Sequence, residues 1–196
     1  MNIAIIQYNA GNIRSVLFAL ERIGATASVT ADHEQIRAAD KVIFPGVGAA
    51  SSAMQSLREA GLDLLIPGLK QPVLGICVGM QLLAAHSEEE DTPCLGIIDG
   101  TVKKFMPSDP HAKVPQVGWN NIYHLRSPLM KDVKENSFCY FVHSYYLPDN
   151  PFSVATTDYV QPYCSALQKD NFYGVQFHAE KSASVGEQIL QNFLNL

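Results

Sequence analysis

Short apolar runs alternate with amphipathic stretches over the first half of the chain. Apolar runs typical of buried strands lie at 2–8, 27–29, 41–44 and 73–76. Apolar residues at helical spacing lie at 16–24, 32–39, 49–59 and 78–86. A turn is expected around residues 10–11 and a loop at 45–48. Because strands that alternate with helices form parallel sheets covered on both faces, this pattern indicates an α/β fold.

From about residue 95 the pattern becomes richer in β-strands. Segments with strand character lie at 96–105, 138–147, 152–159, 164–168 and 173–177, and a final amphipathic helix is expected at 183–195. The whole pattern predicts a flavodoxin-like open, mostly parallel sheet covered by helices, with additional antiparallel strands in the second half. No internal repeat or linker interrupts the sequence, so residues 1–196 are expected to form one domain.

Composition narrows the possible functions. The 196 residues are 47% hydrophobic and 17% charged, as in a globular protein, and the net charge of -5 without a basic stripe argues against nucleic acid as a partner. The apolar runs are too short for a membrane span, and no signal peptide is visible, so a cytoplasmic location is expected. The four cysteines form no CxxC pair, which argues against a metal site, and Cys94, Cys139 and Cys164 are interpreted as reduced packing residues.

Cys77 stands between two glycines, Gly75 and Gly79, where a predicted strand meets a predicted helix. A sharp turn of this kind holds a nucleophile in a strained backbone and exposes its reactive atom. The glycines would let the chain turn tightly, and the first turn of the helix would favour the thiolate. A cysteine in an apolar run is more often a core residue, however, so a catalytic role requires a base and an orienting acid.

A base and an acid lie together near the other end of the chain, where His178 and Glu180 follow the run 173–177. If the strand continues through them, both side chains lie on one face. The carboxylate would then accept a hydrogen bond from one ring nitrogen and leave the other to exchange a proton with a thiol. The same spacing is common at exposed strand ends, and by itself it does not bring the pair to Cys77.

Further segments give the chain a resemblance to a known family. They are Gly11-Asn12, Pro45-Gly46-Val47-Gly48, Gly75–Leu83, Gly118-Trp119-Asn120, Tyr140–Tyr145 and Asn171–Ser182. With the motifs above, they resemble the class I, or triad-type, glutamine amidotransferases. More narrowly, they resemble the glutaminase subunits of imidazole glycerol phosphate synthase, an enzyme of histidine biosynthesis. The resemblance covers nearly the whole chain.

The resemblance implies that the protein hydrolyses the side-chain amide of glutamine to glutamate and ammonia. Cys77 would form a thioester with the substrate, His178 would transfer protons, and Glu180 would orient the imidazole. The N–H groups of Val47 and Val78 would bind the oxyanion. The residues implied to bind glutamine are Gly46, Gly48, Gln81, Glu89, His143, Ser144 and Tyr145. Apart from the resemblance, the acidic run 88–91 is most simply a solvated loop.

The resemblance also implies a heterodimeric partner. In the family, the glutaminase subunit docks on a cyclase subunit with a (β/α)₈ barrel and passes ammonia to it. The barrel then makes imidazole glycerol phosphate and an aminoimidazole carboxamide ribonucleotide. Trp119, Asn120 and Lys181 would lie near the docking face. The sequence contains no evident phosphate-binding loop, which fits nucleotide binding by the partner, and no cofactor is implied.

Three positions depart from the family pattern, and three other functions remain open. Ala179 replaces a usual proline between His178 and Glu180, which would loosen that turn, while Gln7 and Gln116 replace a frequent Asp and a frequent His. The chain could instead be the glutaminase subunit of another synthase, such as the one that makes pyridoxal phosphate. It could also be a free-standing cysteine hydrolase of the same fold, or a binding module with a degenerate site.

Overall fold

The computed structural model describes residues 1–8, 12–109 and 111–196. The turn predicted at residues 10–11, and with it Gly11 of the family resemblance, lies outside the described residues. Among the described residues, no helix has the length and apolar content that crossing a membrane requires. The four cysteines are free: Cys77, Cys139 and Cys164 are buried, and Cys94 is half-buried.

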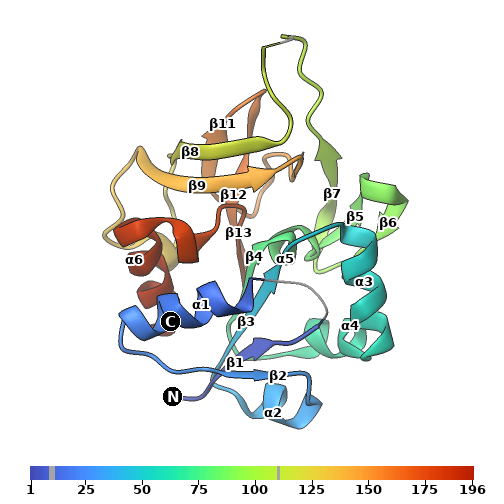
Figure 1. Cartoon of the computed structure of the whole chain (residues 1–196), viewed down its shortest axis with the longest axis vertical. Coiled ribbons are helices and arrows are strands. Elements are labelled where there is room, and N and C mark those ends of the chain that lie inside the picture. The colour runs from blue at the N-terminus through green and yellow to red at the C-terminus, as the bar shows by residue number, and fades with distance from the viewer. Residues whose placement is uncertain (9–11, 110) are drawn as a thin grey trace.

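A seven-stranded sheet forms the centre of the molecule (Figure 1). Its parallel part runs in the order β13 (Phe172–Val175), β4 (Val73–Cys77), β3 (Lys41–Gly46), β1 (Ile3–Ile6) and β2 (Ser28–Thr30). The antiparallel strands β12 (Pro162–Lys169) and β11 (Ser153–Asp158) extend the edge beyond β13. The predicted open, mostly parallel sheet with antiparallel strands in the second half is therefore confirmed.

Helices cover both faces of this sheet, which explains the continuous apolar runs of its strands. Every residue of β1, β3, β4 and β13 is buried, as expected for parallel strands between two helical layers. The helices α1 (Ile13–Arg22) and α6 (Ala183–Leu194) lie on one side, and α3 (Ala50–Glu59) and α4 (Leu62–Leu65) lie on the other (Figure 1). The short helix α2 (His33–Ala38) follows β2.

Two smaller β-structures flank the central sheet. The strands β8 (Gln116–Ile122) and β9 (Ser137–His143) pair antiparallel, and we call them the β8–β9 ribbon (Figure 1). A four-stranded sheet has the order β10 (Tyr145–Tyr146), β7 (Ile98–Lys104), β5 (Ala84–Ser87) and β6 (Thr92–Pro93). The 3₁₀ helices are η1 (Ile66–Gly68), η2 (Glu89–Asp91), η3 (Pro128–Met130) and η4 (Ala179–Lys181).

The helix predicted at 78–86 is wrong beyond Gln81. The helix α5 spans only Val78–Gln81, and Ala84–Ser87 form the strand β5, which pairs in parallel with β7. A short apolar segment fits either structure by its periodicity. Pairing with a strand that lies later in the chain decides between them, and that pairing cannot be read from the segment itself.

Candidate active site

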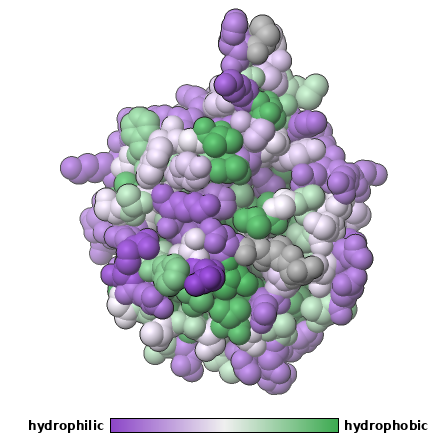
Figure 2. Space-filling model, in the orientation of Figure 1, coloured by the Kyte–Doolittle hydropathy of each residue, from purple (hydrophilic) through white to green (hydrophobic). Residues whose placement is uncertain are grey.

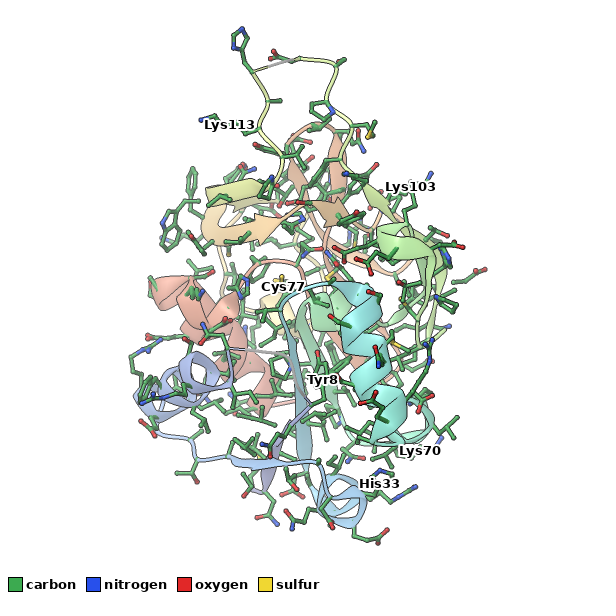
Figure 3. The ribbon with its side chains drawn as sticks, turned by 45° about the vertical axis from the view of Figure 1, so that its right-hand side comes forward. Tyr8, His33, Lys70, Cys77, Lys103 and Lys113 are labelled. Carbon is green, nitrogen blue, oxygen red and sulfur yellow. The ribbon has the colours of Figure 1, made fainter. Side chains whose placement is uncertain are left out.

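The main chain turns sharply at Cys77, where β4 passes into α5. Cys77 has φ 55° and ψ -113°, in the left-handed region that costs a residue with a side chain conformational free energy. The residue is 3% exposed. Figure 3 shows it between the end of the central sheet and the β8–β9 ribbon. The predicted sharp turn at a candidate nucleophile is therefore present.

Gly75 and Gly79 allow this turn by close packing. A Cβ atom on Gly79 would lie 1.9 Å from the carbonyl oxygen of Phe44 on β3, and one on Gly75 would lie 2.7 Å from the carbonyl oxygen of Gly79. A side chain at either position would push α5 away from the sheet. The prediction that these glycines let the chain turn tightly without a Cβ clash is confirmed. The positive φ at the turn belongs to Cys77 itself.

His178 and Glu180 form a buried hydrogen-bonded pair, with Nδ1 of His178 2.8 Å from Oε1 of Glu180. The expectation that a continued strand aligns them is wrong, because β13 ends at Val175. The turn of η4 brings them together instead. The backbone N–H of Lys181 donates to the carbonyl of His178 (3.0 Å), and the hydroxyl of Ser182 donates to the same carbonyl (2.7 Å).

The surroundings of His178 favour its imidazolium form. Burial alone would disfavour that form, but hydrogen bonds to the side chains of Cys77 and Glu180, and the charges of both, raise the pKa of His178 from 6.5 to about 10. Because Nδ1 faces Glu180, Nε2 is the nitrogen left for the sulfur. Oε2 of Glu180 is buried without a hydrogen-bond partner in the described part of the chain, so the carboxylate acts on His178 alone.

A cavity of about 360 Å³ opens in front of Cys77, within the size range of small-molecule sites. Most of the residues predicted to act in the site line it: Val47, Gly48, Cys77, Val78, Gln81, Glu89, His143, Ser144, Tyr145, His178 and Lys181. Gly46 ends β3 and pairs in register with Cys77, and Glu180 lies behind His178. Residues from both halves of the sequence thus meet at one cavity.

The loop after β3 is anchored at both ends. At its start, the hydroxyl of Tyr8 donates to the carbonyl of Pro45 (2.7 Å). At its end, where α3 begins, the backbone N–H of Ala50 donates to Oε2 of Glu89 (2.7 Å). Between these anchors, Gly48 has φ +88°, and a Cβ atom added to it would meet no other atom within 4 Å. The peptide groups in the middle of this loop can therefore turn without displacing packed side chains.

The acidic run 88–91 is more than the solvated loop predicted for it. Glu88 accepts a hydrogen bond from the backbone N–H of Lys104 on β7 (2.8 Å), and Glu90 accepts one from the hydroxyl of Ser51 in α3. Glu89 is half-buried, and burial raises its pKa despite the hydrogen bond from the Ala50 N–H. These carboxylates join the α3 end of the loop to the small sheet, and Glu89 also faces the cavity.

A chain of buried polar groups adjoins the cavity. Nε2 of Gln81 donates to the carbonyl of Tyr145 (2.8 Å) and to Oε1 of Gln176 (2.9 Å). The same carbonyl lies 2.7 Å from Nδ1 of His143. Because a carbonyl only accepts, Nδ1 of His143 carries a proton. Burial lowers the pKa of His143 to about 4, so its ring is neutral at pH 7.

The neutral ring of His143 determines the direction of its hydrogen bond with Tyr163. Its Nε2 is an acceptor, so the hydroxyl of Tyr163, 3.2 Å away, donates to it. Oε1 of Gln116 lies 3.0 Å from the same hydroxyl oxygen. Nε2 of Gln116 is buried without a hydrogen-bond partner in the described part of the chain. Exchanging the two amide atoms lets Nε2 donate to the hydroxyl of Tyr163, whose own proton is directed at His143. Gln116 thereby extends this series of hydrogen-bonded groups to β8.

The residues predicted at the docking face separate into two groups. Trp119 is 53% exposed, and its ring lies 6.0 Å from that of Tyr140, over which Nζ of Lys181 also lies at 6.0 Å. Asn120 lies on the opposite face of β8, as strand alternation requires. Its amide donates to the carbonyl of Asp158 (2.7 Å). Trp119 and Lys181 therefore share an exposed face, and Asn120 joins the ribbon to β11.

Two residues of the site are absent from the sequence-based predictions. Gln176 is fully buried and contacts both Gln81 and Cys77. Its signal in the sequence is a glutamine inside the apolar run 173–177, since a buried amide requires partners. Tyr8 anchors the loop after β3, and burial raises the pKa of its phenol well above the usual range, with the charge of Cys77 adding to the effect. No sequence signal identifies that role.

The chain is similar to known proteins over nearly its whole length. Residues 4–196 match the family model described as "Glutamine amidotransferase class-I". The chain is 56% identical to imidazole glycerol phosphate synthase subunit HisH of Bacteroides fragilis and 54% identical to that of Bacteroides thetaiotaomicron, with 100% of each chain covered. A solved glutamine amidotransferase from Thermotoga maritima has a similar fold, with a TM-score of 0.65 at 15% identity over 100% of this chain and 83% of that one.

The pair of His178 and Glu180 predicts a pH-dependent stability. The folded-state pKa of His178, about 10, lies above its ordinary 6.5, so the pair's contribution is fully present below about pH 6.5 and is lost as pH rises through 10. We expect Glu180→Gln to lower the free energy of unfolding by roughly 1 kcal/mol at pH 7, and by less at pH 10. Urea denaturation at both pH values measures this.

Glu187→Gln is the matched control, because it breaks a half-exposed ion pair with Arg22 that involves no histidine. Its effect on stability should be the same at pH 7 and pH 10. An effect of Glu180→Gln that is equally independent of pH would contradict the charged form of His178.

Proposed function

The chain belongs to the class I glutamine amidotransferases and, within them, to the family of imidazole glycerol phosphate synthase subunit HisH; we propose that it releases ammonia from glutamine for that synthase. The observation that carries the proposal is the presence of Cys77 and His178 in one cavity, with Glu180 bonded to the far side of the imidazole. This supports a thiolate nucleophile with a proton carrier and an orienting acid.

We infer the following steps from the geometry. The thiolate of Cys77 attacks the amide carbon of glutamine and forms a tetrahedral oxyanion. His178 donates its Nε2 proton to the leaving nitrogen, and ammonia departs as the thioester forms. Neutral His178 then takes a proton from water, which attacks the thioester and releases glutamate and the thiolate. Glu180 holds the imidazole orientation throughout and stabilises its charged form.

The oxyanion requires N–H donors, and two peptide groups are suitably placed. The N–H of Val78 follows the nucleophile directly in the chain, at the first residue of α5. We assign the second donor to the N–H of Val47, in the loop that Tyr8 and Glu89 anchor at its ends. Both residues line the cavity. A loop with fixed ends and an unpacked glycine at position 48 can present or withdraw this donor.

Glutamine needs polar partners at its amino-acid end. Glu89 is the carboxylate among the described residues that line the cavity, so we assign the ammonium group to it. The amide nitrogen of Gln81 is engaged by protein acceptors, which leaves Oε1 as a further acceptor for the substrate. We place the rest of the amino-acid end against the segment 143–145, where both ring nitrogens of His143 are already engaged. The role of His143 is to hold the Tyr145 carbonyl in place by donating a hydrogen bond to it.

We propose the exposed face of the β8–β9 ribbon as the docking surface for the synthase's other subunit, which the family resemblance identifies as a (β/α)₈ cyclase. Val117, Trp119 and Phe138 are 61%, 53% and 58% exposed, and hydrophobic residues lie over the ribbon among polar ones in Figure 2. Val142, which pairs with Val117, lines the cavity. A partner seated here would receive ammonia directly from the site.

The activity is tested by glutamate release from glutamine, measured with and without the cyclase and its nucleotide ligand. We expect the partner to raise the rate. Cys77→Ala should lower the stimulated rate by about 10³-fold or more, because no other group forms the thioester. Cys94→Ala, which removes a half-buried cysteine outside the cavity, is the control. Rapid turnover without a partner would favour a free-standing hydrolase, and activity of Cys77→Ala would exclude the thiolate mechanism.

The loop after β3 gives a second prediction. Gly48→Val forces a branched residue into a left-handed conformation, so the 47–48 peptide must rearrange. We expect the partner-stimulated glutaminase rate to fall by about 10²–10³-fold, the usual effect of losing one oxyanion donor. Gly24→Val imposes similar backbone strain after α1, at φ +76° with equally open surroundings, and should keep the rate of the unaltered chain. Equal rates for all three proteins would contradict the assignment of Val47.

The docking surface gives a third prediction. Trp119→Ala removes an exposed aromatic side chain of the kind that dominates interface energies. We expect the Kd for the cyclase to rise by at least ~10-fold, measured by isothermal titration calorimetry. Leu64→Ala, which removes an 83% exposed residue of α4, should bind like the unaltered chain. If Leu64→Ala weakened binding and Trp119→Ala did not, the partner would dock on another face.

A further inference from the structure

Gln176 lies at the level of the nucleophile, directly after the neighbouring strand β13. In the register of β13 with β4, Val175 pairs with Ile76, so Gln176 stands beside Cys77. Its side chain is fully buried, and its backbone N–H donates to the carbonyl of Ser165 on β12 (2.9 Å). A buried carboxamide costs free energy unless both its ends find partners. The identity of those partners therefore indicates what the residue does.

The orientation of this amide follows from its neighbours. The Tyr145 carbonyl can only accept, so the amide of Gln81 turns its nitrogen toward it. That nitrogen also donates to Gln176, which must present its oxygen, Oε1, at 2.9 Å. The nitrogen of Gln176 is then left on the opposite side, 3.8 Å from Sγ of Cys77. The orientation of the Gln81 amide therefore determines that of the Gln176 amide, which directs an N–H donor at the sulfur.

Besides His178, two polar groups contact the sulfur of Cys77, and they have opposite effects on its protonation. The carbonyl of Val142 lies 3.8 Å from Sγ and accepts from the thiol, so it favours the protonated form. The N–H of Gln176 can only donate, so it favours the thiolate. We infer that Gln176 is a positioning residue that holds an N–H donor on the Cys77 thiolate while it fixes the amide of Gln81. The inference rests on the proposed role of Cys77 as nucleophile.

Two variants separate the two contacts of Gln176. Gln176→Met has a similar length, cannot donate to the sulfur and offers Gln81 only a weak thioether acceptor. Gln176→Glu keeps an acceptor for Gln81 but replaces the N–H with a carboxylate oxygen, which disfavours a second negative charge beside it. Gln168→Met is the matched control, because Gln168 lies on β12 and its side chain bonds to the hydroxyl of Tyr173 (3.3 Å), away from the sulfur.

The primary measurement is the pH dependence of Cys77 alkylation by iodoacetamide in the full chain, followed by mass spectrometry of the peptide that contains Cys77. Both Gln176 variants should shift the midpoint of the alkylation profile upward by about one pH unit, which is about a tenfold loss of thiolate below the midpoint. The other titratable groups around the sulfur stay the same in every variant: Tyr8, Glu89, His143, Tyr163, His178, Glu180 and Lys181.

The second measurement is the glutamine dependence of the rate in the assembled synthase. Gln176→Glu should lower kcat and leave KM within about twofold, because its contact with Gln81 is kept. Gln176→Met should lower kcat and raise KM. Alkylation profiles like that of Gln168→Met in both folded variants would overturn the inference. Because alkylation requires no turnover, this failure is distinct from a failure of the proposed function, which the Cys77→Ala assay tests.

Discussion

The active site depends on the close approach of α5 to the central sheet. The separation of 1.9 Å between a hypothetical Cβ on Gly79 and the Phe44 carbonyl leaves room for hydrogen alone. The absence of a side chain at Gly79 lets the first turn of α5 lie against β3, and Cys77, which connects β4 with that turn, has a positive φ. The strain at the nucleophile is balanced by packing among buried strands. The loop after β3 and the end of β13 reach the sulfur because their strands adjoin β4.

Around this turn, polar groups orient one another in series. One backbone carbonyl, that of Tyr145, accepts from both Gln81 and His143, so its two lone pairs are engaged. From this point one branch leads through Gln81 and Gln176 to the sulfur, and the other leads through His143 and Tyr163 to Gln116 in the ribbon. Buried networks of this kind favour one arrangement, because reversing the amide of Gln81 would set its oxygen against the carbonyl oxygen of Tyr145. The Tyr145 carbonyl thus determines the orientations of the Gln81 amide and the His143 imidazole.

Much of the fold and the chemistry can be predicted from local sequence. Apolar runs identify the strands of the parallel sheet, and the Gly-x-Cys-x-Gly spacing identifies both Cys77 and the close packing that its flanking glycines allow. The spacing of His178 and Glu180 identifies the pair, yet a 3₁₀ turn aligns them and not a strand. Beyond local patterns the predictions stop. The periodicity of β5 also fits a helix, and only its partner β7, later in the chain, decides. Gln176 escapes prediction because its partners come from α5 and β4.

The peptide of Tyr140 has a consequence for exchanging parts between related proteins. Its N–H donates to the hydroxyl of Ser182 (3.0 Å), and its carbonyl accepts from the N–H of His178 (2.9 Å). These two hydrogen bonds join β9, a strand of the β8–β9 ribbon, to the segment 178–182, which carries the imidazole. A chimaera that takes β9 from a relative with a different assembly would also move the proton carrier. We therefore expect β9 and residues 178–182 to require exchange together.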